Sequence, residues 1–423
     1  MKKILFIAHA FHPSNHANAT RPFLEAKAFL EKGWDVEVLA SGLGILPGAE
    51  EAFSESNQFR VIRLNDPLSR LHDWLSRRDG WLYKKVDSML LALAWPDLPV
   101  FWGLKAAWWL RNKKHDAIVC SIQPKSVLLL PLLMKRVKAS WVIDYQDSVS
   151  AQFKRYPRKS PIHRVLTPVL AKIEKVALSR VDRAMFTSES NRQAYISDGL
   201  VAPEKTGFIP QFFEESLYDR SLRWDGESFN IIYAGNFDRT GRRTPEVFLK
   251  ALGGFLKKHS EAIGKVRFDF YGRWWPEHGQ FVEALELQDI VKIHPAVPYE
   301  EYLKVLQTSA MLLLVTSPVH NLFIPGKLTD YLGACRPILA FTPLDSETRR
   351  ILCSANVKSY ICSDEDVSEG VQMIEQLWAD YCERNLSSST LNDVAEWSSD
   401  VLGGRFVKNV GASLLRNRGV NTE

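Results

Sequence analysis

The sequence predicts an α/β protein with two doubly wound parallel sheets. Short, continuously apolar segments recur along the chain, as expected for strands that are buried on both faces. Segments with the 3.6-residue apolar spacing of helices separate them. The alternation breaks once, after Pro210, and then restarts. The 423 residues are therefore expected to form two Rossmann-like domains.

The first domain is expected to hold residues 1–212. Its opening strand, residues 3–10, is one apolar run, and a polar loop follows it. A helix over 21–32 has apolar residues at helical spacing, and Gly33 ends it. The other strands are expected at residues 36–40, 117–121, 140–144, 183–187 and 206–209. The other helices are expected at residues 126–136, 168–179 and 189–197.

Residues 213–228 are polar and irregular, which is typical of a linker. The second domain, residues 229–400, opens with a strand at 229–237 and a helix at 245–258, with Thr244 as the predicted N-cap. Its other strands are expected at residues 266–271, 291–293, 311–315, 337–341 and 357–361. Its other helices are expected at residues 281–287, 299–308, 327–334, 346–353 and 367–383.

The C-terminal segment, residues 401–423, begins with an apolar-periodic stretch. We expect it to form a last helix that packs back on the first domain. Ligands are expected in a cleft between the two domains, outside the carboxyl ends of the strands.

Charge is distributed unevenly along the chain. Residues 1–215 hold 31 Lys and Arg against 22 Asp and Glu, a balance of +9, and the remainder holds 23 against 27, a balance of −4. Residues 70–114 combine 9 basic and 4 acidic residues with six of the 13 tryptophans. This composition fits a solvated basic face over a Trp-rich core, and it equally fits a surface that meets the inner face of a membrane. No nucleic-acid-binding motif accompanies the charge, so no nucleic-acid partner is expected.

The sequence favours a cytoplasmic protein. No apolar run reaches the roughly 18 residues of a membrane span. The start could pass for a signal peptide, but its apolar part is short and runs into His9, which favours a strand. The five cysteines form no C-x-x-C pair, which favours reduced thiols. His9, His12 and His16 share one loop, but no carboxylate lies among them, so no metal is expected.

Two common nucleotide motifs are missing. The first strand-to-helix turn, residues 9–21, contains no glycine, which argues against the G-x-G-x-x-G fingerprint of dinucleotide binding. No G-x-x-x-x-G-K-[ST] segment is present either. Dehydrogenases and P-loop ATPases are therefore not supported, and no cofactor is expected.

Two segments of the second domain suit a nucleoside diphosphate. Residues 235–246 place three arginines and two glycines between a strand end and a helix start. In residues 325–337, Pro-Gly opens a helix, Lys327 lies in its first turn, and Asp330 follows on the same face. A cation for phosphate and a carboxylate for a ribose are thus about one turn apart. The alternatives are a solvated basic loop and a surface ion pair between Lys327 and Asp330.

These segments resemble those of bacterial glycosyltransferases of the GT-B fold, most closely family 4, whose members use nucleotide sugars and retain the anomeric configuration. Residues 325–340 resemble the family's P-x-K-L-x-E-Y-L-A-x-G-x-P-V-x-A block, which is the most specific match. Residues 120–126 resemble its S-x-P-P-x-S turn, and residues 141–147 its W-x-x-D-x-R-D strand end. Similar segments also occur, in the family's order, at residues 3–41, 208–212 and 235–252.

The resemblance implies a hexosyltransferase-type enzyme that transfers a sugar from a nucleoside-diphosphate sugar, without a metal and with retention. The acceptor would belong to the synthesis of a bacterial surface polysaccharide, lipopolysaccharide or lipid-linked glycan. Lys327, with Arg242 or Arg243, would hold the diphosphate. Asp330 would bind the ribose, and the backbone of Val297 would contact the base. The other donor-binding positions implied are Gly235, Asn236, Arg239, Gly272, Pro325 and Gly326.

The first domain supplies the predicted catalytic residues. Arg21 and Asp147 match positions of the family that face the cleft, and His12 lies on the first loop, where it could approach the reacting sugar.

Three departures from the family pattern support an alternative. Leu322 stands where a glutamate is common, Val127 and Leu128 occupy a turn where a histidine is common, and Gln146 replaces an arginine. A non-catalytic GT-B protein that binds a nucleotide sugar or a partner enzyme is the alternative. A sugar-nucleotide epimerase of the same fold is disfavoured, because the acidic and histidine residues that it needs are not evident.

Overall fold

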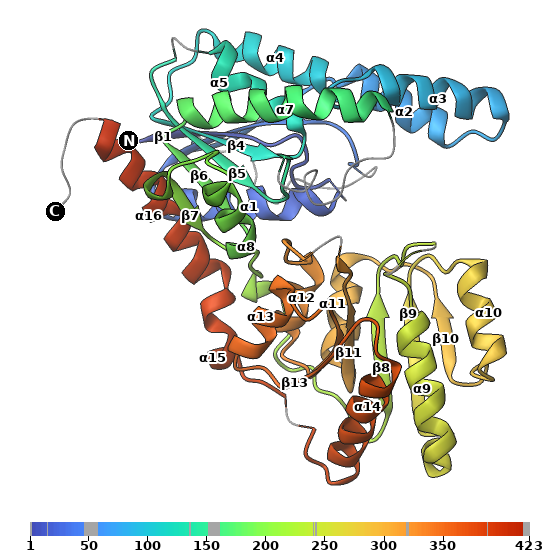
Figure 1. Ribbon diagram of the computed structural model, residues 1–423. Helices are drawn as coiled ribbons and strands as arrows, with labels where there is room; N and C mark the ends of the chain where they lie inside the picture. The colour runs from blue at the N-terminus through green and yellow to red at the C-terminus, as the bar shows by residue number, and fades with distance from the viewer. Residues whose placement is uncertain are drawn as a thin grey trace. The chain divides into compact units, whose positions relative to one another are not determined.

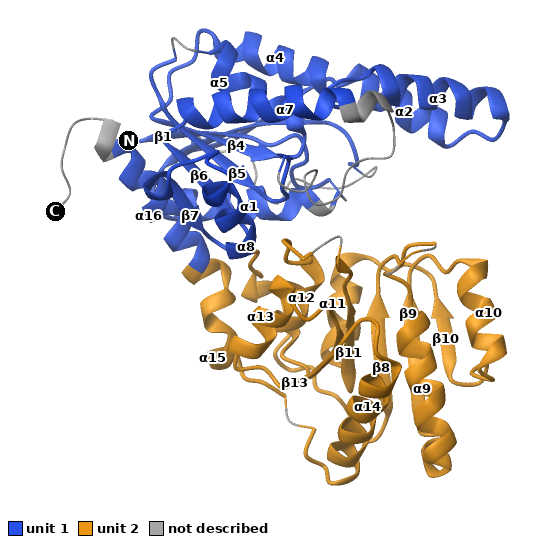
Figure 2. Ribbon diagram, viewed as in Figure 1, with its two compact units in different colours: residues 1–210, 402–423 blue, residues 211–401 orange. Residues whose placement is uncertain are grey.

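The computed structural model forms two compact units (Figure 2). The first contains residues 1–210 and 402–423, and the second contains residues 211–401. The structure describes residues 2–14, 16–45, 58–134, 137–150, 161–239, 241, 243–318, 321–386 and 388–417.

The first unit is built on a seven-stranded parallel sheet with the order β3-β2-β1-β4-β5-β6-β7 (Figure 1). Its strands are β1 (Lys3–Ile7), β2 (Asp35–Ser41), β3 (Phe59–Leu64), β4 (Ala117–Ile122), β5 (Ser140–Tyr145), β6 (Arg183–Phe186) and β7 (Thr206–Phe208). Every residue of β4 and β5 is buried, because helices cover both faces of the sheet. This explains why these strands are continuous apolar runs in the sequence.

Eight helices of the described chain belong to the first unit in whole or in part. They are α1 (Thr20–Glu31), α2 (Pro67–Ser76), α3 (Trp81–Leu93), α4 (Val100–Leu110), α5 (Leu130–Leu133), α7 (Pro161–Arg180), α8 (Glu189–Ser197) and α16 (Ser399–Asn417). From Leu402 onward α16 is part of this unit. There the Phe406 ring meets the Phe29 ring of α1 edge-on at 6.2 Å, and the Ser413 hydroxyl is hydrogen-bonded to the Ser140 hydroxyl at 2.7 Å.

The second unit has a six-stranded parallel sheet with the order β10-β9-β8-β11-β12-β13. Its strands are β8 (Phe229–Ala234), β9 (Val266–Tyr271), β10 (Val291–His294), β11 (Met311–Val315), β12 (Ile338–Phe341) and β13 (Ser359–Cys362). Its helices are α9 (Glu246–Lys258), α10 (Pro276–Ala284), α11 (Tyr299–Gln307), α12 (Gly326–Ala334), α13 (Glu347–Ser354), α14 (Val367–Cys382) and α15 (Leu391–Val394). The fold class predicted from the sequence is confirmed.

Several predicted boundaries are wrong, and proline accounts for most of them. The helix predicted at 126–136 is a 3₁₀ turn, Lys125–Leu129, followed by α5, because Pro131 has no amide hydrogen to continue one helical ladder. Helix α7 begins at Pro161 and accommodates Pro168 in its interior. Helix α10 begins at Pro276, five residues earlier than predicted, since proline suits a first helical turn.

The predicted N-cap at Thr244 is also wrong. Helix α9 starts at Glu246 with Pro245 in the cap position, and no side chain caps it. The predicted linker packs within the second unit, where the Tyr218 hydroxyl donates to the Asp330 carbonyl and Gln307 donates to the Asp219 carbonyl. The segment is therefore held in place by these side-chain contacts rather than by a long helix or a strand.

Residues 42–116 received no predicted element, yet they contain β3, α2, α3 and α4. Strand β3 is half-exposed, so its apolar pattern is weak. Helix α3 has no buried residue, so its apolar side chains face no core. The five cysteines are free thiols, with Cys353 and Cys382 exposed and the other three buried.

Candidate functional site

The strand order places a natural ligand site in the second unit. Strands β8 and β11 are neighbours in the sheet, but the chain passes through β9 and β10 between them. The connections after β8 and after β11 therefore leave the sheet in opposite directions, and in such sheets ligands bind at this point, outside the carboxyl ends of the strands. Here the loop after β8 begins at Gly235, and the connection after β11 leads to Gly326, the first residue of α12.

Two predicted glycines are required by this geometry. Gly235 follows β8 with φ +130°, and Gly272 follows β9 with φ +141°. A Cβ on Gly235 would lie 2.4 Å from Nζ of Lys327, and a Cβ on Gly272 would lie 2.4 Å from the Gly235 carbonyl oxygen. Neither position can hold a side chain without movement of its neighbours, so the glycines let Lys327 lie directly on the backbone at the strand ends.

Lys327 forms no ion pair with any carboxylate in the part of the chain that the structure describes. Its Nζ lies 3.8 Å from the centre of the Tyr233 ring, and it forms no ion pair with Asp330, although both residues are described. The surface-pair alternative is therefore wrong. Burial, and after it the charge of Arg243, lower the pKa of Lys327 to about 7, while the charge of Asp330 opposes the decrease.

The start of α12 adds further donors. Pro325 occupies the cap position in an extended conformation, and no side chain caps the helix. Within the described residues, the amides of Gly326 and Lys327 have no hydrogen-bond acceptor. Free amides and the positive end of the helix dipole favour an anion at this place.

Asp330 lies one turn further along α12 and is already hydrogen-bonded. The hydroxyls of Tyr299 and Tyr302 donate to its two oxygens at 2.9 and 3.1 Å. Burial raises the pKa of Asp330 to about 6, while these two hydrogen bonds and Lys327 oppose the increase. Neither tyrosine was predicted as a site residue, because both lie on a different helix, α11. Their 299/302 spacing places them on one face of that helix and is the one indication that the sequence offers. Val297, half-buried, lies just before this helix.

The predicted arginines are engaged by carboxylates of the protein. Arg243 donates to Asp238 at 2.8 Å, and its Nε is buried with no acceptor among the described residues. Arg239 donates to Glu277 at 2.6 Å and is largely exposed. Arg242 lies outside the described residues.

The loop after β9 contributes an arginine that was not predicted. The Arg273 guanidinium lies 3.9 Å from the centre of the Trp275 ring, and its amide donates to the side-chain oxygen of exposed Asn236 at 3.4 Å. Arg273 directly follows Gly272, at the same sheet edge as Lys327, and this position could have indicated that it belongs to the site. Leu322 is buried, so the position where the family often has a glutamate is part of the core here.

In the first unit, Arg21 is a structural residue. It is 2% exposed, and its Nε and Nη2 donate to the two oxygens of Asp144 at 2.9 Å. Its Nη1 donates to the Pro210 carbonyl at 2.8 Å, and Glu25 lies 3.0 Å from Nε. All three nitrogens are thereby engaged, which corrects the prediction that Arg21 faces a substrate.

Asp147 is the predicted catalytic carboxylate of the first unit. It follows β5, is half-buried, and accepts no hydrogen bond within the described part of the chain. Burial raises its pKa, and the charge of Lys125 opposes the shift. His12 lies after β1, and its ring is 4.7 Å from the Phe23 ring. Gln146, which replaces the family's arginine, donates to Ser121 at 2.9 Å and is buried.

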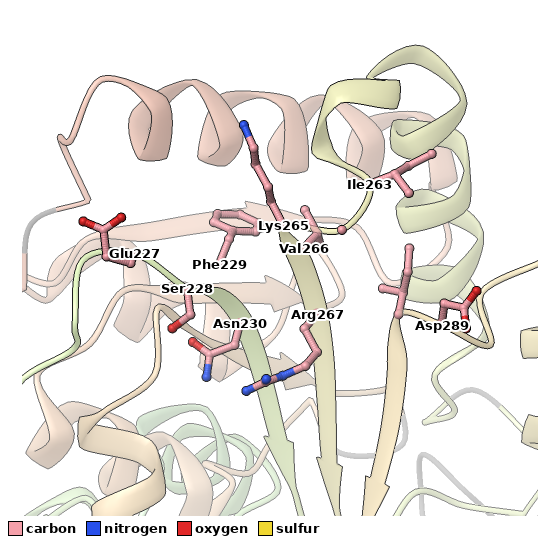
Figure 3. A pocket seen from close by; sticks show the side chains of 11 residues that line it. Glu227, Ser228, Phe229, Asn230, Ile263, Lys265, Val266, Arg267 and Asp289 are labelled. Atoms are coloured by element: carbon pink, nitrogen blue, oxygen red, sulfur yellow. The ribbon is translucent and has the colours of Figure 1, made fainter.

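A hollow of about 450 Å³ lies elsewhere in the second unit (Figure 3). Residues at the starts of β8 and β9, including Phe229 and Arg267, line it together with Asp289. These are the amino ends of the strands, opposite to the edge that carries Lys327. Rossmann-like sheets bind ligands at the carboxyl ends, so no role follows for this hollow.

Comparison with solved structures supports the fold over the whole chain. The sucrose-phosphate synthase of Thermosynechococcus elongatus matches with a TM-score of 0.58 and 15% identity, covering 99% of this chain and 98% of that one. The α,α-trehalose 6-phosphate synthase of Burkholderia multivorans matches with a TM-score of 0.66 and 11% identity over 100% and 99% of the two chains. The UDP-forming α,α-trehalose-phosphate synthase of Burkholderia xenovorans, in complex with glucose 6-phosphate, matches with a TM-score of 0.62 and 12% identity over 97% and 100%.

No protein-family model matches the chain, and no curated protein sequence matches it. The structural matches show that the chain has the GT-B fold, with two Rossmann-like units. At such low identity they assign no family within that fold.

Proposed function

We propose that this protein is a glycosyltransferase that takes its sugar from a nucleoside-diphosphate sugar. The observation that carries the proposal is the amino group of Lys327, which forms no ion pair within the described residues and lies against Gly235 at the uncapped start of α12. A diphosphate at this point would accept hydrogen bonds from the free amides of the helix and would also interact with the side chain of Lys327. The structural neighbours named above are sucrose-phosphate and trehalose-phosphate synthases, and that of Burkholderia xenovorans is described as UDP-forming.

Each neighbouring side chain has a proposed role. Arg243 and Arg273 would add positive charge around the diphosphate, and no metal is required because these groups supply it. The Tyr299–Asp330 pair would border the ribose, with the backbone near Val297 at the base. In the first unit, Asp147 would accept a hydrogen bond from the acceptor hydroxyl, since its carboxylate accepts none from the residues that the structure describes. We propose retention at the anomeric carbon, in keeping with the resemblance to family 4.

The proposal also concerns the acceptor of the sugar. We favour a glycan or lipid-linked acceptor of bacterial surface polysaccharide synthesis, in the cytoplasm. One structural neighbour was solved with glucose 6-phosphate, so a sugar phosphate is the competing acceptor.

The test is nucleoside diphosphate release from a panel of UDP-, GDP- and dTDP-sugars, with water, glucose 6-phosphate or lipid-linked glycans as acceptors. We expect release from one donor, stimulated by one acceptor and lost in Lys327→Ala, while Lys304→Ala, an exposed lysine of α11, retains it. Binding without release under any condition would support the non-catalytic alternative. Conversion of the sugar without an acceptor would indicate an epimerase.

A further inference from the structure

Helix α3 carries a row of apolar side chains that nothing in the described structure covers. Leu82, Val86, Met89 and Leu93 are spaced i, i+4, i+7 and i+11, which places them within about 60° of arc on one helix face. They are 55%, 43%, 55% and 78% exposed. We call these four residues the apolar stripe. A helix normally turns such a face toward a core, so the stripe indicates a partner.

Two residues on another face of α3 contact helix α2. The Tyr83 ring meets the Trp74 ring of α2 at 6.0 Å, and Asp87 is bonded to His72 of α2 at 2.6 Å. These residues hold α3 against α2, and Figure 1 shows the two helices projecting together from the body of the first unit. The stripe is therefore presented outward by packing and is not a consequence of a loose helix.

Helix α4 also has an exposed apolar face. Its inner face, including Trp102 and Leu110, is buried in the core. Its outer face carries Phe101, Leu104 and Trp108 at i, i+3 and i+7 spacing, and these are 50%, 46% and 71% exposed. Trp81, at the start of α3, is 74% exposed. Exposed tryptophans of this kind are typical of the boundary between water and lipid.

The charges around the stripe are positive. Two nearby carboxylates are engaged internally, since Asp73 pairs with Arg77 at 2.8 Å and Asp87 is hydrogen-bonded to His72, and the exposed Asp79 is the exception. Arg78, Lys84 and Lys85 form no ion pair within the described residues. The Arg78 guanidinium instead lies 4.1 Å from the centre of the Trp74 ring.

We propose that the apolar stripe and the outer face of α4 dock on an anionic lipid bilayer. Leu82, Met89 and Leu93 would enter the headgroup boundary, while Lys85, which flanks the stripe, and Arg78 contact lipid phosphates. A second copy of the chain fits less well, because a symmetric contact would bring the same unpaired cations together. No helix within the described residues is long and apolar enough to cross a membrane, so α3 would lie in the interface plane.

The experiment is sedimentation of the full chain with phosphatidylcholine vesicles that contain or lack phosphatidylglycerol, without any nucleotide. The result is therefore independent of the proposed function. We expect binding to the anionic vesicles alone, weakened by salt. Arg78→Gln/Lys85→Gln should lower the affinity roughly 25-fold, about fivefold for each cation. Leu82→Gln/Met89→Gln/Leu93→Gln should lower it about tenfold or more.

Matched controls come from the second unit. Lys257→Gln/Lys292→Gln removes two exposed lysines, and Ile263→Gln/Ile293→Gln/Leu344→Gln removes three apolar residues that are 59%, 53% and 71% exposed. Both should bind as the parent chain does, and unchanged melting temperatures verify that all variants fold. The proposal is overturned if the anionic vesicles do not bind the parent chain, or if the stripe variant binds them equally well. Dimerisation in sedimentation velocity that the stripe variant abolishes, without vesicle binding, would also overturn it.

Discussion

Replacing Gly235 with alanine tests whether the close approach of Lys327 to the backbone matters for donor binding. At φ +130° an alanine is strained by about 1–3 kcal/mol. Its Cβ would also lie 2.4 Å from Nζ and 2.5 Å from Cε of Lys327. Since nonbonded carbon contacts are about 3.5–4.0 Å, the ammonium group must move by about 1 Å or more. A charged hydrogen bond is worth about 1.5–3 kcal/mol, so its loss should weaken diphosphate binding roughly tenfold to a hundredfold.

Titration calorimetry with UDP, GDP and dTDP measures this effect, and thermal unfolding measures the strain separately. Gly264→Ala is the matched control in the same unit, because its φ is +83° and a Cβ there meets nothing within 4 Å. It should lose stability but retain nucleotide binding. The argument fails if Gly235→Ala binds as tightly as the parent chain, or if Gly264→Ala loses as much affinity.

Three further predictions concern titration and packing. Because the pKa of Lys327 is lowered to about 7 and a bound anion would raise it, nucleoside diphosphate affinity should fall as pH rises above 7, by up to about tenfold per unit, in calorimetry between pH 7 and 9. In Tyr302→Phe, Asp330 loses one of its two donors, so urea unfolding should show a loss of about 1–3 kcal/mol. In Arg21→Met, Asp144 is left as an unpaired buried charge, so unfolding should show a loss of about 3–5 kcal/mol.

Each of these predictions has its own control. Lys327→Met should remove the pH dependence, and an unchanged slope in that variant would assign the proton to another group. Tyr83→Phe removes a hydroxyl that forms no hydrogen bond within the described chain, and it should cost little. Arg77→Met breaks an exposed pair, 76% and 51% exposed, and should cost less than about 1 kcal/mol. A cost as large as that of Arg21→Met would contradict the argument from burial.

The sequence could predict those parts of the fold in which the apolar residues of a segment are also the residues buried in the core. Buried parallel strands such as β4, β5 and β11 are uninterrupted apolar runs, and the start of α12 is marked by Pro325 and Gly326. Helices α2, α3 and α4 were not predicted. Apolar residues at helical spacing normally mark the buried face of a helix, whereas these helices also carry apolar residues on exposed faces. The prolines at 131, 168 and 276 misplaced helix ends, since one residue type starts, tolerates or interrupts a helix according to its context.

The sequence by itself determined the two-sheet class and the placement of Lys327 and Asp330 on one helix, because one strand end and one helix start encode them locally. Only the tertiary structure decided what each charge meets. Arg21 is enclosed by Asp144, 123 residues away, and Asp330 is held by tyrosines of another helix. Lys327 lies over the Tyr233 ring and pairs with no carboxylate among the residues that the structure describes. Partners that are distant in the sequence come together only on folding, and they determine how deeply each charged side chain is buried and whether its charge is neutralised.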